Sequence, residues 1–168
     1  MSNNFYKQLK IGNKKENYVC EVLNICGINA ESNNDVEVTD IDLIIHDLKM
    51  IMDVKFINTA FTNSETFIGL KPEDCLPINV RHVHNYAKKE VETKYQAWVC
   101  FLIKLEDYNI NEIKFVPVSL LEHLINSNKG VIRNGKLNFD RNICYDMTQF
   151  LNYCKDRKEY KPKKYCFR

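Results

Sequence analysis

The stretch from Val38 to Phe56, VTDIDLIIHDLKMIMDVKF, sets acids and a lysine among strongly apolar residues. Asp40 and Asp42 precede the run LII, whereas Asp53 and Lys55 interrupt a second apolar run, MIMDVKF. Carboxylates are rarely buried unless a partner or a metal compensates their charge. The pattern therefore predicts a polar site that is built on two apolar strands.

The spacing of these residues decides which chemistry they can share. Side chains alternate across a strand, so Asp53 and Lys55 point to one face, and Asp40 and Asp42 share a face likewise. If the two strands pair as a hairpin, an acid of the first lies beside the Asp53–Lys55 pair. Two converging carboxylates suit a hard cation such as Mg²⁺ or Mn²⁺. A neighbouring ammonium can hold and polarise the attacking water, which indicates hydrolysis of a phosphodiester.

The motifs IDLII and MDVKF, eleven residues apart from Asp42 to Asp53, resemble the signature of the PD-(D/E)xK, or restriction-endonuclease-like, nuclease superfamily. Ile41 stands where its members usually have proline. The resemblance implies a Mg²⁺-dependent endonuclease, in which Mn²⁺ substitutes and Asp42, Asp53 and the Val54 carbonyl bind the metal. It further implies that Lys55 orients the water and stabilises developing charge.

Members of this superfamily usually carry a glutamate on a helix upstream of the metal-binding strands. The corresponding segment here, GNKKENYVCEVL, offers Glu16 and Glu21. Glu16 shares a helix face with Val19 and Leu23, at i+3 and i+7, so it lies at the edge of the buried stripe. Glu21 lies off that stripe. We therefore expect Glu16 to support a metal or its waters.

The other elements predict a mixed α/β domain around these residues. Apolar residues at three- and four-residue steps predict a helix from Tyr6 to about Cys26, and two strands follow at 36–45 and 50–57. Residues 58–79 read as a long polar loop, mobile in the free protein, with a short strand near 66–70. That loop is expected to become ordered over DNA.

The second half of the chain predicts a helix, two strands, a second helix that Ser119 caps, a hairpin at Asn134-Gly135 and a closing helix. The fold class is therefore α/β. We expect a restriction-endonuclease-like core, with a central mixed β-sheet flanked by helices and with a C-terminal hairpin and helix.

Length and composition indicate one ordinary globular domain. The chain has 168 residues, of which 45% are hydrophobic and 27% charged. No apolar run approaches the ~18 residues of a membrane span, and the polar start MSNNFYKQLK lacks a signal-peptide core. We expect a cytoplasmic protein in an intracellular, reducing environment, without membrane association.

The seven cysteines have no C-x-x-C spacing, which disfavours a zinc ribbon or knuckle. Cys20, Cys26 and Cys100 fall within apolar patterns and are predicted to be small core residues. For the last three cysteines of the chain, a role in metal binding stays open as an alternative.

The chain divides into one nuclease-like domain, residues 1–154, and a basic, aromatic C-terminal tail, residues 155–168. The tail holds seven basic, two acidic and three aromatic residues, which suits phosphate contacts with some stacking or, equally, a solvated tail. Expected nucleic-acid contacts are Lys88 and Lys89 on the predicted helix and Lys161, Lys163 and Lys164 in the tail.

The function predicted is cleavage of DNA, double-stranded or branched, by an endonuclease of restriction, homing, junction-resolving or phage repair type. One small domain with one site needs two copies to cut both strands, so a homodimer or larger homo-oligomer is expected. The alternative is a non-catalytic nucleic-acid-binding or assembly module that retains the fold. In that case Asp53 and Lys55 form an ordinary ion pair, and Glu16 is a solvated helix residue.

Overall fold

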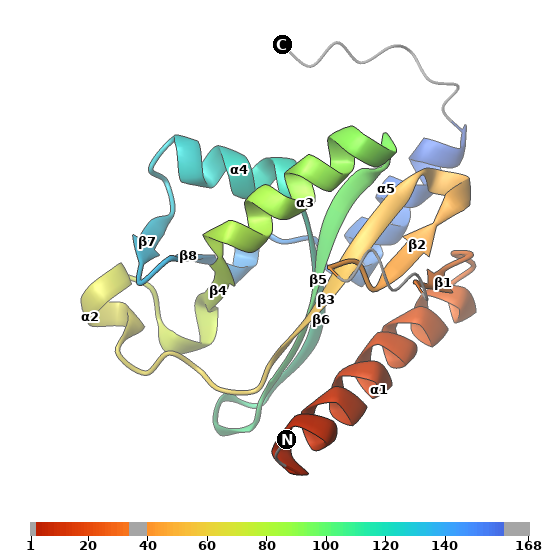
Figure 1. Cartoon of the computed structure of the whole chain (residues 1–168). Helices are drawn as coiled ribbons and strands as arrows, with labels where there is room; N and C mark the ends of the chain where they lie inside the picture. Colours follow the sequence, from red (N-terminus) through yellow and green to blue (C-terminus); the bar gives the residue numbers. More distant parts are fainter. Residues whose placement is uncertain (1–2, 34–39, 160–168) are drawn as a thin grey trace.

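The computed structural model describes residues 3–33 and 40–159, with the side chains of 14–33 and 40–157. A five-stranded sheet forms the centre of the molecule (Figure 1). Its strands, in spatial order, are β1 (Glu31–Ser32), β2 (Leu43–Ile45), β3 (Met50–Ile57), β5 (Gln96–Leu105) and β6 (Ile110–Pro117). Only β3 and β5 pair in parallel, so the sheet is mixed, as the sequence predicts.

Helices cover both faces of this sheet (Figure 1). On one face lie α1 (Asn3–Ile25) and α5 (Met147–Glu159), and on the other lie α3 (Val80–Thr93) and α4 (Val118–Asn126). The alternation along β3 produces two cores, because Met50 and Met52 pack toward α1 and α5 whereas Ile51 packs toward α3 and α4. The helices and strands predicted around the sheet are confirmed.

A second, three-stranded antiparallel sheet stands beside the first. Its order is β4 (Cys75–Asn79), β8 (Lys136–Asp140) and β7 (Val131–Arg133). Asn134 and Gly135 join β7 to β8 with φ values of 51° and 73°, as a type I′ turn requires. The C-terminal hairpin is thereby confirmed, whereas its pairing with β4 was not expected from the sequence.

The segment 58–79 differs from its prediction. The strand expected near 66–70 is wrong, because these residues belong to α2 (Ser64–Ile68) and the turn after it. The buried Ser64 hydroxyl donates to the Leu70 carbonyl at 2.7 Å, and Gly69 ends the helix with a left-handed φ of 78°. The Ser64 side chain and the left-handed Gly69 therefore close the segment as a short helix.

Two predicted element boundaries also shift. Ser119 does not cap α4, because the chain passes directly from β6 into the helix, and Pro117 occupies the cap position. Of the first strand of the hairpin, predicted at 36–45, Leu43–Ile45 form a strand and residues 40–42 do not. Residues 34–39 lie outside the part of the chain that the structure describes.

The C-terminal helix α5 continues to Glu159, so residues 155–159 of the predicted tail are helical. Lys161, Lys163 and Lys164 lie outside the described residues. Of the described helices, none combines the length and apolar character that crossing a membrane requires.

The cysteines follow the prediction in part. Cys100 is fully buried and Cys20 half-buried, but Cys26 is exposed just after α1, so its assignment to the core is wrong. Cys144 and Cys154 are buried in different cores, which separates them as possible ligands of one metal. Cys166 lies outside the described residues.

Candidate active site

The β2–β3 hairpin brings the two expected acids together. A short 3-10 turn at His46–Leu48 and a left-handed Lys49 close the hairpin, with Leu43 opposite Met52. One residue before β2, the Asp42 amide donates to the Met52 carbonyl at 3.0 Å. The register therefore sets Asp42 against β3 beside Asp53.

Asp53 is a buried carboxylate with two partners on the same oxygen. Its side chain points toward α3 and is 5% exposed. Lys55 Nζ lies 2.7 Å from Asp53 Oδ2, and the Tyr86 hydroxyl donates to this oxygen at 2.6 Å. A charged group can remain buried because an ammonium and a hydroxyl together compensate its lost hydration.

Asp42 is held differently, through the backbone of β3. Its Oδ2 accepts a hydrogen bond from the Val54 amide at 2.7 Å. Burial, followed by the negative charge of Asp53, raises the pKa of Asp42 to about 8, against the opposing effect of the Val54 hydrogen bond. Glu16 adds a further contribution in the same direction. Burial and the neighbouring negative charge therefore favour the protonated form of Asp42.

Glu16, on α1, acts on this site through its charge. Val19 and Leu23, which share its helix face, are fully buried, whereas Glu16 itself is half-buried. Its effect on the pKa of Asp42 shows that the charges of Glu16 and Asp42 interact. Glu21 is exposed on the same helix, so α1 offers Glu16, and not Glu21, to the hairpin.

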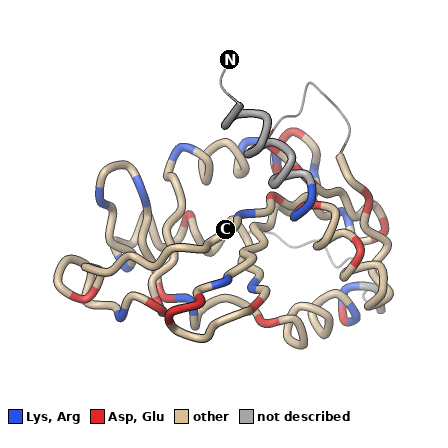
Figure 2. The backbone as a smooth tube through the Cα atoms, turned by 90° about the horizontal axis from the view of Figure 1, so that it is seen from below, with Lys and Arg blue, Asp and Glu red and all other residues tan. Residues whose placement is uncertain are grey.

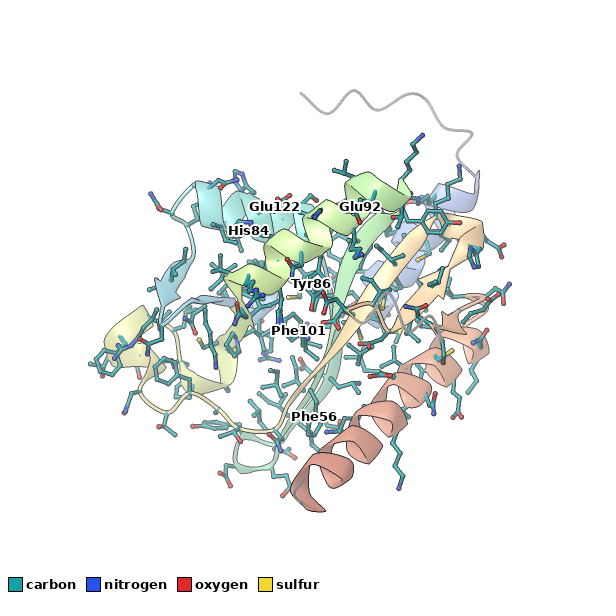
Figure 3. The ribbon with its side chains drawn as sticks, in the orientation of Figure 1. Phe56, His84, Tyr86, Glu92, Phe101 and Glu122 are labelled. Atoms are coloured by element: carbon teal, nitrogen blue, oxygen red, sulfur yellow. The ribbon has the colours of Figure 1, made fainter. Side chains whose placement is uncertain are left out.

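Tyr86 was not expected at the site from the sequence. It extends from α3 toward the central sheet (Figure 3) and is 2% exposed. Burial, and then the charge of Asp53, raises its pKa, which keeps the hydroxyl protonated and able to donate. Its position three residues after the buried Val83 was the available signal, because a tyrosine on an apolar helix face needs a partner for its hydroxyl.

The donor chemistry of these residues fits a hard divalent cation. Two adjacent carboxylates, Asp42 and Asp53, offer oxygen atoms of the kind that Mg²⁺ and Mn²⁺ bind, and Val54, whose carbonyl is the expected additional ligand, contacts Asp42 through its amide. The raised pKa of Asp42 reflects burial and, after it, the negative charge of Asp53, and a bound cation would oppose both effects. Among the described residues, no three His, Cys, Asp or Glu side chains are arranged as a complete metal cluster.

Lys88 and Lys89 lie on α3, two and three residues beyond Tyr86. Both approach Glu92, near the end of the helix (Figure 3), at 3.8 Å and 3.5 Å. Neither forms an ion pair with Asp42 or Asp53 in the described structure. The contact with nucleic acid that is expected of these two lysines would therefore be made from the outer surface of α3.

Two solved structures share this architecture. One is Hjc, a Holliday junction resolvase from Archaeoglobus fulgidus, with a TM-score of 0.55 and 10% identity, over 84% of this chain and 95% of that one. The other is D212, a nuclease from a fusselovirus, with a TM-score of 0.50 and 10% identity, over 92% and 88% of the two chains. No protein-family model and no curated protein sequence matches the chain. The likenesses confirm the restriction-endonuclease-like fold that the sequence predicts.

Proposed function

We propose that this protein is a divalent-metal-dependent nuclease that hydrolyses phosphodiester bonds in DNA. The observation that carries the proposal is the contact of the Lys55 ammonium with the buried Asp53 carboxylate, 2.7 Å apart, beside the raised-pKa carboxyl of Asp42. The fold that the chain shares with a junction resolvase and a viral nuclease supports it. Fold alone does not imply activity, so the site residues are the stronger argument.

The ligands of the metal would be the carboxylates of Asp42 and Asp53 and the carbonyl of Val54. When bound, Mg²⁺, or Mn²⁺ in its place, would supply Lewis-acid activation of the phosphate and lower the pKa of a coordinated water. Glu16 would support the metal or its waters, as its electrostatic effect on Asp42 suggests.

The protein's own residues would orient the reacting atoms. Lys55 Nζ would donate a hydrogen bond to the attacking water and then to the phosphate oxygen on which charge accumulates. Tyr86 would hold Asp53 in a fixed orientation through its hydroxyl, since its ring is packed in the core. As the water oxygen forms its bond to phosphorus, it would release a proton to solvent, the bond to the leaving oxygen would break, and that oxygen would take up a proton from solvent.

The remaining contacts with DNA would come from basic residues outside the acid cluster. Lys88 and Lys89 on α3, and Lys161, Lys163 and Lys164 beyond the described residues, would bind phosphates. A homodimer would provide the two sites that cleavage of both strands requires. Branched DNA belongs among the test substrates because one structural neighbour is a Holliday junction resolvase.

A plasmid-nicking assay tests the proposal. We expect relaxed or linear product with Mg²⁺ or Mn²⁺, and none with Ca²⁺ or EDTA. Asp53→Asn, which keeps the size of the side chain, is the inactive control. Binding without cleavage under every metal condition would favour the non-catalytic alternative instead. Linear duplex, single strand, four-way junction and RNA, assayed side by side, would define the substrate.

A further inference from the structure

A groove of about 560 Å³ runs between α1 and the β5–β6 hairpin, separate from the acid cluster. Figure 1 shows α1 running beside the sheet, with the β5–β6 hairpin at the bottom of the view. Helix α1 contributes Lys14, Lys15 and Tyr18, and Phe56 stands at the end of β3. The two strands of the hairpin complete the lining with Leu102, Ile103, Lys104, Asn111, Glu112 and Ile113.

The groove carries a local excess of positive charge. Acidic and basic positions are interspersed over the described backbone (Figure 2), so a cluster of three lysines in one groove is informative. Glu112, the acid in the lining, forms ion pairs with Arg141 and, at 4.0 Å, with Lys114. Its charge is thereby compensated from outside the groove. Lys104 forms an exposed ion pair with Glu106 at 3.5 Å, whereas Lys14 and Lys15 form none with another described residue.

The lysines are combined with aromatic rings. Lys15 Nζ lies 3.1 Å from the centre of the Phe56 ring, a cation–π contact, and burial lowers the pKa of Lys15. Tyr18 is 52% exposed and follows Lys14 by four residues, so both lie on one face of α1. An exposed ring beside cations is the arrangement that binds a base by stacking and its phosphate by charge.

The groove adjoins the proposed site through neighbouring residues. Lys15 precedes Glu16 on α1, and Phe56 follows Lys55 on β3. Because side chains alternate, Phe56 faces α1 whereas Lys55 faces α3, so the two sites lie on either side of the end of β3. A chain of nucleotides that passes over this end would connect them.

An unpaired strand suits the groove better than a duplex does. In a duplex the faces of the bases are stacked on one another, so an exposed tyrosine ring can reach them only in an unpaired segment. The groove's volume is also that of a pocket for a small ligand, which is too small for a double helix.

We infer that this groove binds a single-stranded segment of the nucleic acid on which the proposed nuclease acts. Tyr18 stacks on a base, and Lys14 and Lys104 contact the flanking phosphates. Lys15, held on Phe56, lines the path toward Lys55. The inference rests on the proposed function for its substrate, but binding can be measured without cleavage.

The test measures binding of a fluorescent single-stranded oligonucleotide, and of the matching duplex, by anisotropy in EDTA. Tyr18→Ala should weaken single-strand binding at least about fivefold, the lower end of what one stacked base contributes. Tyr18→Phe should bind as the wild type does. Lys14→Gln combined with Lys104→Gln should reduce the salt slope by about 1.4, and the exposed control Lys129→Gln should leave it unchanged.

Each further outcome bears on one claim. The groove assignment is wrong if Tyr18→Ala binds single strand as the wild type does, or if it loses affinity equally for single strand and duplex. In either case, cleavage by the wild type would still support the proposed function. Loss of single-strand binding in the groove variants of a protein that cleaves no substrate would support the groove and refute the nuclease proposal. Melting temperatures of the variants should match the wild type because the substituted side chains lie at the surface.

Discussion

The Tyr86 hydroxyl and the Lys55 ammonium meet on a single oxygen of Asp53, at 2.6 Å and 2.7 Å from Oδ2. One partner comes from α3 and the other from β3, so the pair fixes the carboxylate between two elements. This arrangement leaves Oδ1 as the oxygen of Asp53 that neither partner holds. A helix residue far away in the chain therefore orients the residue on which the proposed chemistry depends.

Tyr86→Phe tests this relationship because it removes the hydroxyl and retains the packed ring. We expect a loss of about 1.5–3 kcal/mol in the free energy of unfolding, as is typical when a hydrogen bond to a charged group is removed. Urea denaturation in EDTA measures it. Tyr145→Phe is the matched control, since its ring packs on Trp98 at 5.5 Å between centroids. Equal stability of both variants and the wild type would contradict the assigned role.

The raised pKa of Asp42 predicts a pH dependence of stability in the metal-free protein. Between the ordinary value of 3.8 and about 8, the folded state retains a proton that the unfolded state has lost. Stability should therefore fall as pH rises through this window and level off above it. Asp42→Asn should reduce that fall. Denaturation curves at several pH values in EDTA give the free energy of unfolding as a function of pH. If that free energy changes with pH equally in the variant and the wild type, the prediction is wrong.

Lys55→Ala should abolish cleavage and leave binding of DNA in Ca²⁺ within about threefold of the wild type. The ammonium acts on the reacting water, whereas most of the affinity comes from phosphate contacts elsewhere. Stability should also decline, because Asp53 loses its compensating cation. The exposed Lys71→Ala is the control for the loss of one positive charge. Nicking activity in a folded Lys55→Ala protein would remove Lys55 from the proposed mechanism.

The two glutamates of α1 should differ in their effects. Glu16→Gln should slow cleavage by at least about tenfold, because the Glu16 charge acts on Asp42, whereas Glu21→Gln should remain near wild type. Single-turnover rates with saturating Mg²⁺ measure the difference. A larger effect of Glu21→Gln would show that α1 supports the site in another way.

Removal of residues 160–168 should weaken DNA binding and lower its salt slope by roughly 0.9 for each phosphate that the tail neutralises. Truncation at 159 is preferable to truncation at 154, because Arg157 contacts Gln96 and Tyr153 and so belongs to the folded domain. Binding isotherms at three salt concentrations provide the slope. An unchanged slope would show that Lys161, Lys163 and Lys164 do not bind phosphates.

Much of the site could be predicted because its geometry is local. The two-residue alternation of a strand sets Asp53 and Lys55 on one face wherever that strand lies, and a four-residue turn returns Asp42 to β3. The helical period likewise distinguishes Glu16 from Glu21. The fold class followed from the same periodicities, since each apolar face had to be covered by another layer.

Where the sequence misled, the reasons were a local capping pattern, the exact end of a helix and a strand pairing between distant segments. The segment at 66–70 looks extended by composition, but Ser64 and Gly69 close it as a short helix. Cys26 fits the apolar pattern of α1 and yet lies beyond the end of the helix, in solvent. The β4–β8 pairing joins residues about sixty apart, which no local periodicity encodes.

The sequence alone was enough to predict the strand that carries Asp53 and Lys55, the turn between β2 and β3, and the helix face that carries Glu16. It took the packing of the elements to establish that Tyr86 binds Asp53, that the Asp42 carboxyl is buried enough to raise its pKa, and that Lys15 lies on Phe56. The physical reason is that backbone periodicity fixes the direction in which each side chain points. The burial of a side chain and the charges around it depend on which other elements pack against it.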